Sequence, residues 1–237
     1  MSQLTGEARA RYVGTMFARI VQSYDLMNTL MTFGLDRSWR DAAADATLLR
    51  PGGLALDVAC GTGELAFALV RAGARLAIGL DFTPEMLEAA RAKEDRPGAT
   101  RTLFVAGDAL HLPFPNDAFD AATVGFGLRN FADLPRALAE LRRVVKPGGR
   151  VVSLEMTHTP FPVVALLFWP YFHLLVPLIG RLVSGDPGAY RYLPASVGSF
   201  PSASELARLM HTAGLREVRY RYLGLGTVAI HVGVKAG

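Results

Sequence analysis

The chain has 237 residues, of which 51% are hydrophobic and 19% charged, which suits one α/β domain and excludes a disordered chain. Its one cysteine, Cys60, excludes an intrachain disulfide, and five scattered histidines form no ligand pair at helical spacing, so we expect no metal site. The net charge of +4 is spread along the chain without a basic stripe, so we expect no nucleic-acid partner. Residues 1–11 lack the apolar core of a signal peptide, which predicts a cytoplasmic protein.

Most of the chain alternates apolar runs with helical patterns. Residues 12–50 carry apolar side chains at three- and four-residue steps and predict a helical cap over 1–50, which Pro51-Gly52-Gly53 ends. Lys146-Pro147-Gly148-Gly149 predicts a tight turn. Strand and helix repeated in this way predict a parallel sheet with helices on both faces. We expect strands at 54–60, 75–82, 102–107, 121–126 and 150–155, and helices at 64–72, 84–93 and 134–145.

The C-terminal end departs from this alternation. Ser202 and Glu205 have the spacing of a capping box, which predicts a helix over 202–213. Residues 217–223 and 227–234 read as two strands that a short glycine-containing connection joins as a hairpin. These signals predict a mostly parallel sheet with an antiparallel C-terminal strand, and no linker divides the chain into two domains.

Residues 161–179 carry no formal charge, which raises the question of a transmembrane helix. Pro162, Pro170 and Pro177 interrupt the segment and would leave backbone groups unpaired in lipid, so we reject a span. Three interpretations remain: a buried core helix, a lid over an apolar ligand, or a segment in the membrane interface.

The most specific motif runs from Asp57 through Gly61-Thr62-Gly63 to Glu64, between the first predicted strand and the next helix. Two glycines one residue apart allow the backbone to pass close to a ligand. Such a loop lies at the carboxyl edge of a parallel sheet, where nucleotides bind. Asp81 ends the following strand, about 20 residues further on, where a carboxylate can hold both ribose hydroxyls. The motif therefore predicts a nucleotide site.

The spacing Gly61-x-Gly63-x-x-Ala66 also satisfies the dinucleotide fingerprint, so an NAD enzyme is one alternative. Asp57 argues against it, because its charge repels a pyrophosphate and attracts an ammonium group. Asp108-Ala109 follows the third strand, where an acid can accept a hydrogen bond from the adenine amino group. These features resemble the class I S-adenosylmethionine-dependent methyltransferases. The resemblance implies a Rossmann-like α/β fold whose sheet is mostly parallel, with an antiparallel C-terminal strand and helices on both faces.

From about residue 12 to the C-terminus, further motifs resemble the quinone-biosynthesis C-methyltransferases. That family methylates demethylmenaquinol and, in some organisms, 2-polyprenyl-6-methoxy-1,4-benzoquinol. The motifs are Tyr24-Asp25-x-Met27-Asn28, Gly34-Leu35-Asp36-Arg37-x-Trp39-Arg40, Phe126-Gly127-Leu128-Arg129-Asn130, Gly185-Asp186-x-x-x-x-Tyr190-x-Tyr192-Leu193 with Ser199-Phe200-Pro201, and Gly226-Thr227-Val228-Ala229-x-His231-x-Gly233-x-Lys235.

The resemblance implies that S-adenosylmethionine is the cofactor. At Gly125, where related sequences often carry a small residue such as serine, this chain can offer the cofactor only its backbone. With the loop motif, the expected binding residues are Asp57, Gly61, Thr62, Gly63, Asp81, Asp108, Ala109 and Gly125.

Methylation of a ring carbon requires an electron-rich acceptor, and an ionised quinol oxygen supplies the electron density. A phenol with a pKa of about 10 is only about one part in a thousand ionised at pH 7, so a fixed cation beside the oxygen is a large advantage. Arg129, after the fourth predicted strand, is the candidate cation, and the alternative is a surface arginine paired with Asp133. The candidates for a general base are Tyr24, Asp25 and His173.

A prenylated quinol resides in a bilayer, so its enzyme needs an apolar channel or contact with the membrane face. We therefore expect residues 157–200 to form an apolar lid, and the protein to bind peripherally at the inner face of the membrane. Alternatives are another small phenolic or sterol-like acceptor, an RNA methyltransferase, and a methyltransferase-like protein that only binds a partner. The sequence fixes neither the prenyl length nor the oligomeric state, and a homo-oligomer is compatible with it.

Overall fold

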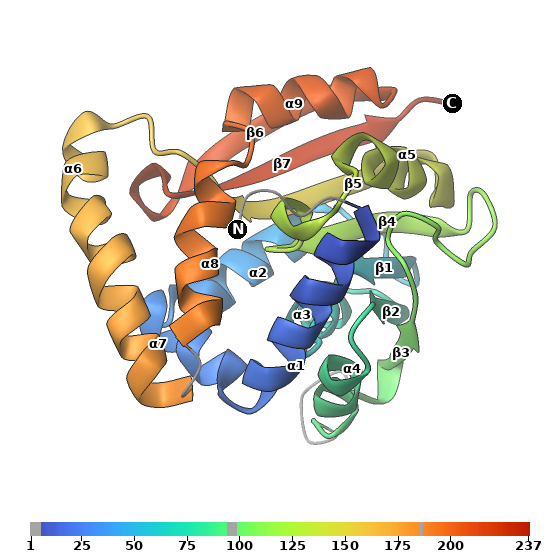
Figure 1. The fold of residues 1–237 in the computed structure, drawn as a ribbon. Coiled ribbons are helices and arrows are strands. Elements are labelled where there is room, and N and C mark those ends of the chain that lie inside the picture. Colours follow the sequence, from blue (N-terminus) through green and yellow to red (C-terminus); the bar gives the residue numbers. More distant parts are fainter. Residues whose placement is uncertain (1–5, 94–98, 185–186) are drawn as a thin grey trace.

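The computed structural model describes residues 6–93, 99–184 and 187–237, and one seven-stranded sheet organises them (Figure 1). The strand order is β3-β2-β1-β4-β5-β7-β6, with β7 antiparallel to both of its neighbours and the other pairs parallel. The predicted, mostly parallel sheet with an antiparallel C-terminal strand is confirmed. The strands are β1 (Leu54–Val58), β2 (Leu76–Asp81), β3 (Thr102–Ala106), β4 (Phe119–Gly125), β5 (Val145–Met156), β6 (Leu215–Leu223) and β7 (Val228–Lys235).

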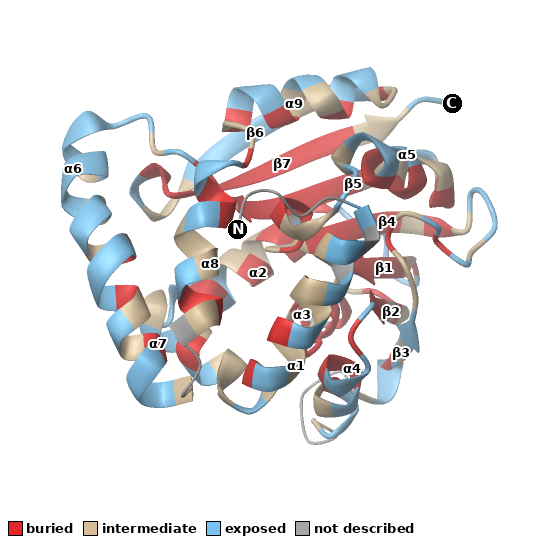
Figure 2. Cartoon of the chain, in the orientation of Figure 1, coloured by how far each residue is buried: buried red, intermediate tan, exposed pale blue. Residues whose placement is uncertain are grey.

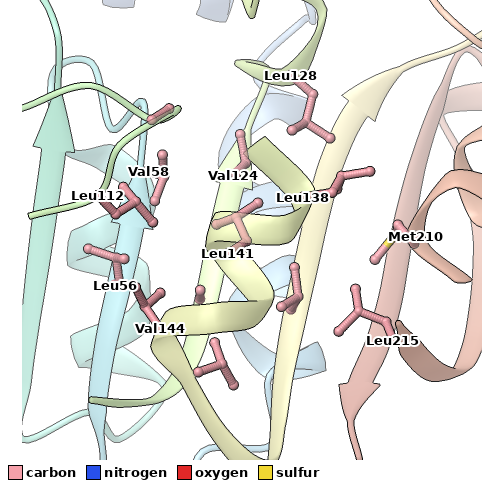
Figure 3. Packing of buried hydrophobic residues seen from close by; sticks show 14 of the residues in the cluster. Leu56, Val58, Leu112, Val124, Leu128, Leu138, Leu141, Val144, Met210 and Leu215 are labelled. Carbon is pink, nitrogen blue, oxygen red and sulfur yellow. The ribbon is translucent and has the colours of Figure 1, made fainter. Parts of the chain in front are cut away.

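Alternating side chains of the central strands enter two separate cores. Leu56 and Val151 face α5 (Leu134–Val144) and α9 (Ala203–Thr212), as Figure 3 shows for α5 over β4 and β5. Their neighbours Ala55 and Val152 face the opposite cluster, which includes side chains of α2 (Leu35–Ala46) and α3 (Glu64–Arg71). This period of two places helices on both faces, as the sequence predicts. It also buries the central strands, while the edge strands β3 and β6 and much of the outer helical surface stay exposed (Figure 2).

Three local expectations need correction. Residues 12–50 form two helices, because α1 (Gly6–Met31) ends at a turn in which Phe33 and Gly34 adopt left-handed φ values of 53° and 77°. The turn predicted at 146–149 lies inside β5, as an irregularity in its register with β4. Helix α8 (Pro187–Gly198) was missed, because Pro194 and Gly198 argue against a helix in sequence. Ser202 does cap α9 through the predicted capping box with Glu205.

The uncharged segment forms one long helix outside the sheet. It consists of α6 (Pro162–Pro170), a π-helical turn (Tyr171–Leu175) and α7 (Val176–Ser184). Pro170 has no N–H to donate, and the helix widens into the π turn directly after it. Among the described residues, Pro162–Ser184 is the one helix long and apolar enough to cross a membrane by length and composition alone. Only 17% of its most apolar stretch is buried, so the core-helix interpretation is wrong.

Helix α1, the long helix and α8 pack together beside the carboxyl edge of the sheet (Figure 1). Met16 and Ile20 of α1 join Phe172 and Val176 of the long helix and Tyr190 of α8 in a third apolar cluster. The predicted cap and lid therefore contact each other. Helix α4 (Pro84–Arg91) packs against α1 and β3. Gly185 and Asp186 of one family motif lie outside the described residues.

Candidate active site

The glycine loop between β1 and α3 is tied to the end of β2. Asp81 accepts hydrogen bonds from the backbone N–H of Gly61 at 2.8 Å and of Thr83 at 2.9 Å. Burial raises the pKa of Asp81 above its usual value, and these backbone hydrogen bonds oppose the rise. Ala59 has a left-handed φ of 55°, a strained conformation of the kind that concentrates at functional sites. The predicted proximity of loop and acid is present in the structure.

The two loop glycines are required for different reasons. A Cβ on Gly61, where φ is +53°, would meet only a Tyr24 ring carbon at 3.8 Å, so its backbone is open on that side. A Cβ on Gly63 would lie 2.7 Å from the ring of Phe104, so this glycine permits helix α3 to pack on the sheet. Close approach to a ligand, the predicted reason for both glycines, fits Gly61 alone.

Asp57 is the buried charge of the loop. It is 1% exposed, and Thr123 Oγ1 donates a hydrogen bond of 2.7 Å to its Oδ1. Within the described residues, Oδ2 is buried without a hydrogen-bond partner. Burial raises the pKa of Asp57 to about 7, against the lowering effects of Thr123 and Arg40. A buried oxygen with a free lone pair beside a glycine loop fits the ammonium group of an amino-acid-like ligand.

Three further residues that we expect to bind the cofactor, Asp108, Ala109 and Gly125, lie at the carboxyl edge of the sheet. Asp108 accepts a hydrogen bond from Leu110 N–H at 2.8 Å, and its side chain is half-exposed. Ala109 next to it is buried. Gly125 ends β4, and a Cβ there would lie 3.0 Å from Leu65 Cδ2, so a larger residue would push against α3. None of these positions conflicts with a bound nucleoside.

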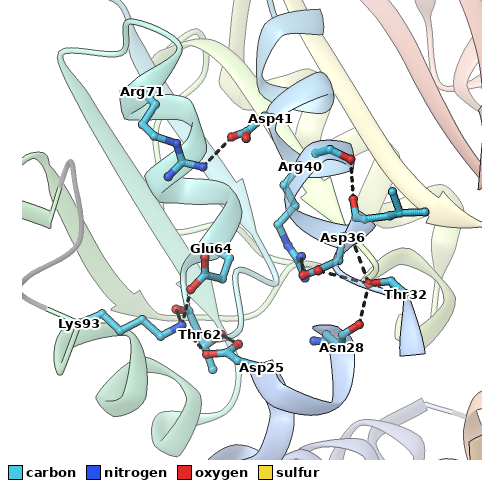
Figure 4. A network of polar contacts seen from close by, with 12 residues as sticks. Asp25, Asn28, Thr32, Asp36, Arg40, Asp41, Thr62, Glu64, Arg71 and Lys93 are labelled. Atoms are coloured by element: carbon cyan, nitrogen blue, oxygen red, sulfur yellow. Dashed lines mark hydrogen bonds and ion pairs between the residues drawn. The ribbon is translucent and has the colours of Figure 1, made fainter. Parts of the chain in front are cut away.

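Asp25 contacts the glycine loop through Thr62 (Figure 4). Its Oδ1 accepts a 2.6 Å hydrogen bond from Thr62 Oγ1, and its Oδ2 lies 2.6 Å from Lys93 Nζ. Lys93 also donates to Thr62 O and to Glu64, each at 2.8 Å. This network fixes α1 to the glycine loop and to the end of α4, so a ligand in the loop lies beneath the cap.

A mostly apolar cavity lies beneath α1, the long helix and α8, and Tyr24, whose ring faces Gly61, is part of its wall. Apolar and aromatic side chains make most of the wall, for example Ile20, Phe126 and Phe172. Its polar side chains are Tyr24, Asn28, Thr32, Asp36, Arg40, Arg129 and Thr227, with the hydroxyls of Tyr171, Tyr190 and Tyr192. The cavity therefore suits a ligand with a small polar part and a large apolar part.

Arg129 lines this cavity and is buried, not a surface residue paired with Asp133. Its Nη1 donates to Glu155 Oε1 at 2.5 Å and to Phe126 O at 2.6 Å. Its Nε is buried and has no hydrogen-bond partner among the described residues. A buried guanidinium that keeps one N–H free can still donate to a ligand.

Tyr24 and Asn28 lie one helical turn apart on the cavity wall. Burial raises the pKa of the Tyr24 hydroxyl, although Arg40 and Arg129 each lower it. Tyr24 therefore stays protonated at neutral pH and acts as a hydrogen-bond donor, which argues against its expected role as a base. The Asn28 side chain contacts Tyr24, while its Nδ2 is buried without a partner meeting hydrogen-bond geometry in the described parts of the chain.

His173 does not reach the cavity. It is exposed on the π-helical turn, where its ring stacks on Trp169 with centroids 4.8 Å apart. Phe172 and Val176 point inward from the same helix, so His173 faces outward. The structure thus brings together Tyr24 and Arg129 but not Asp25 or His173.

Sequence reasoning missed four residues of the site: Asn28, Arg40, Lys93 and Glu155. Asn28 and Arg40 stand inside quoted motifs but were given no role. Glu155 lies on β5, whose neighbour β4 leads into the Arg129 segment, so only the strand order reveals the pair. Nothing in the sequence points to Lys93.

Known proteins match nearly the whole chain. The model of the ubiE/COQ5 methyltransferase family matches residues 4–235. The demethylmenaquinone methyltransferase of Thermus thermophilus is 48% identical over 92% of this chain and 99% of that protein, and that of Roseiflexus castenholzii is 44% identical over 98% and 96%. The ubiquinone/menaquinone biosynthesis C-methyltransferase UbiE of Paracoccus denitrificans is 40% identical over 96% and 92%.

Solved structures share the fold at low identity. A SAM-dependent methyltransferase of Thermotoga maritima aligns with a TM-score of 0.64 and 21% identity, over 93% of this chain and 98% of that one. A candidate S-adenosyl-L-methionine-dependent methyltransferase of Methanococcus maripaludis aligns with a TM-score of 0.65 and 16% identity, over 92% of each chain. These likenesses show the Rossmann-like methyltransferase fold.

The raised pKa of Asp57 makes the free energy of unfolding depend on pH. Between its usual pKa of 3.8 and about 7, the folded protein keeps a proton that the unfolded chain loses. The stability therefore falls as pH rises through this window and levels off above it. We expect the wild type to lose about 3 kcal/mol relative to Asp57→Asn between pH 5 and pH 8, in urea denaturation without ligand. The same pH dependence in both proteins would contradict the raised pKa.

Proposed function

The chain belongs to the ubiE/COQ5 methyltransferase family, and on that premise we propose that it methylates a ring carbon of demethylmenaquinol, forming menaquinol. It is an S-adenosylmethionine-dependent methyltransferase of quinone biosynthesis. The observation that carries the choice of acceptor is the apolar cavity, which has arginines at its polar end and adjoins the glycine loop. A prenylated quinol has this division, with two ring oxygens and a hydrocarbon tail.

S-adenosylmethionine, when bound, supplies an electrophilic methyl group on a sulfonium. The free oxygen of Asp57 would accept from its ammonium group, and Asp81 from its ribose hydroxyls. Asp108 would accept from the adenine amino group beside Ala109. The backbones of Gly61, Thr62, Gly63 and Gly125 line the same edge of the sheet.

Arg129 would hold the quinol oxygen as it loses its proton. The free Nε offers a charged N–H, and Glu155 fixes the guanidinium from behind. The apolar wall strengthens this attraction, because little water competes for the oxygen. Tyr24 would donate a second hydrogen bond in the same space. A negative oxygen would raise the electron density at the adjacent ring carbon, the atom that accepts the methyl group.

The acceptor assay separates the naphthoquinol from the benzoquinol. We expect purified protein to methylate demethylmenaquinol with a short prenyl tail at least tenfold faster than 2-polyprenyl-6-methoxy-1,4-benzoquinol, measured as radiolabel transfer from S-adenosylmethionine. Equal or faster methylation of the benzoquinol would replace the acceptor proposed here. Transfer to neither quinol, with S-adenosylmethionine bound in calorimetry, would point to another phenolic acceptor.

Arg129→Ala should lower turnover and leave the affinity for S-adenosylmethionine unchanged. Loss of one charged contact to a developing anion costs about 100- to 1000-fold in rate, and Arg129→Lys should recover only part of it. The measurement is single-turnover methylation of demethylmenaquinol with both ligands saturating, across pH. The alanine variant leaves Glu155 buried and unpaired, so Arg129→Met/Glu155→Gln serves as a folded comparison. Rates within threefold of wild type at every pH would make Arg129 structural.

The long helix would take up the tail at the membrane surface. Phe168, Tyr171, Phe172 and Val176 face the cavity, whereas Leu166 and Leu182 on the outside are 74% and 77% exposed. The inner side of this helix is covered by the protein, whereas its apolar outer side is exposed to water, which is unfavourable unless another apolar surface covers it. Phe33 after α1 is exposed as well and stacks on Tyr171, so the apolar surface continues onto the cap. The fitting occupant is a lipid bilayer, which also delivers the prenyl tail.

Leu166→Asp/Leu182→Asp should weaken binding to phospholipid vesicles more than tenfold, because each substitution removes an apolar side chain and places a negative charge on the apolar surface. Vesicle co-sedimentation measures the effect. Leu48→Asp is the matched control, since Leu48 is 65% exposed in the loop before β1 and away from this helix. Alkaline carbonate should strip the wild type from membranes. Retention after carbonate extraction would indicate a true span and contradict surface binding.

A further inference from the structure

The polar end of the cavity contains a second buried ion pair, to which the proposed function assigns no role. Arg40 and Asp36 lie one turn apart on α2, with side chains 9% and 13% exposed. Arg40 Nη1 donates to Asp36 Oδ2, and Thr32 Oγ1 donates to Asp36 Oδ1 at 3.2 Å (Figure 4). The Arg40 Cζ lies 5.5 Å from the centre of the Phe126 ring. The guanidinium is therefore held on several sides inside an apolar cavity.

Stability alone does not explain this pair. Removing two charges from water costs more than their attraction commonly returns, and well-packed apolar residues often do as well or better. Arg40 also has donors to spare. Within the described residues, its guanidinium makes one hydrogen bond, from Nη1. The remaining N–H groups have no acceptor there, although the residue lines the cavity.

Arg40 and Arg129 face the same space. Both line the cavity, and both lower the pKa of the Tyr24 hydroxyl, a phenol of the protein on the same wall. The buried Arg129 Nε also lacks a hydrogen-bond partner among the described residues. This end of the cavity thus has more donors than acceptors, which fits a ligand that brings oxygen acceptors. The charged or titratable groups around Arg40, Arg129 and Tyr24 are Asp25, Asp36, Asp57 and Glu155, with Tyr171, Tyr190 and Tyr192 on the cavity wall.

We propose that Arg40 is a second catalytic arginine, which donates to a ring oxygen of the quinol and, with Arg129, stabilises its ionised form. The assignment rests on the proposed function, because it requires a quinol in the cavity. Asp36 and Thr32 are positioning residues that hold the guanidinium toward the ligand. No covalent step is added: the quinol oxygen gives its proton to water, and the two guanidinium groups stabilise the negative charge that remains on it.

The test replaces the whole ion pair by apolar side chains, so that no unpaired charge remains buried. Asp36→Leu/Arg40→Met should melt at or above the wild-type temperature and bind S-adenosylmethionine as the wild type does. Its single-turnover rate of demethylmenaquinol methylation at pH 7 should fall at least tenfold. At pH values where the wild-type rate no longer changes, the rate of the variant should still rise, by up to tenfold per pH unit, because without Arg40 the quinol ionises at a higher pH. Arg40→Lys, which keeps the charge, should retain more activity than the pair variant.

The exposed pair between Asp41 of α2 and Arg71 of α3 is the matched control, 2.6 Å apart and outside the cavity lining. Asp41→Leu/Arg71→Met should methylate at the wild-type rate. If Asp36→Leu/Arg40→Met also stays within threefold of wild type at every pH, Arg40 is only structural and this inference is overturned. Wild type that binds S-adenosylmethionine but does not methylate the quinol would instead overturn the proposed function.

Discussion

The buried carboxylate of Asp57 is the constraint on which the site depends. β1 lies between β2 and β4, so a charge at its carboxyl end has protein on both sides and little access to water. Thr123 satisfies one carboxylate oxygen, and the other has no partner in the described residues. Ionisation of this group is therefore costly until a cation arrives. This cost arises between β1 and β4, where the order of the strands reverses, and α/β sheets bind ligands at the carboxyl edge of such a point.

The same constraint recurs at the two arginines. Arg129 has Glu155 as its partner and Arg40 has Asp36, so each guanidinium enters the cavity already neutralised. Each pair keeps N–H groups that the described residues do not use. An apolar wall of low dielectric makes such donors more effective toward an anion and more costly to leave unpaired. The cap and the long helix supply much of that wall through the apolar side chains that they pack beside the sheet.

The contact between Gly61 and Asp81 could be predicted from the sequence, and the contact between Arg129 and Glu155 could not. Gly61 and Asp81 end or follow adjacent strands, so their spacing predicts their contact. For Arg129 the sequence offers Asp133, four residues away, as the alternative ion-pair partner, but the partner is Glu155 from the next strand of the sheet. His173, a candidate general base in the sequence, stands in an apolar segment. The segment is apolar on both sides, so composition alone does not reveal which way the ring points.

The cap lies on the glycine loop, where the cofactor would bind, and the long helix lies on the side of the cavity where the acceptor's prenyl tail would bind. Asp25 and Lys93 hold α1 on the glycine loop, which places that loop between the sheet edge and the cap. On the other side of the cavity, Phe172 faces inward and Leu166 outward from the same helix. A polar cofactor dissolves in water and a prenylated acceptor in lipid, so the enzyme must offer each of them a suitable environment close to the other. In this chain Arg40, Arg129 and apolar side chains of the long helix line the same cavity.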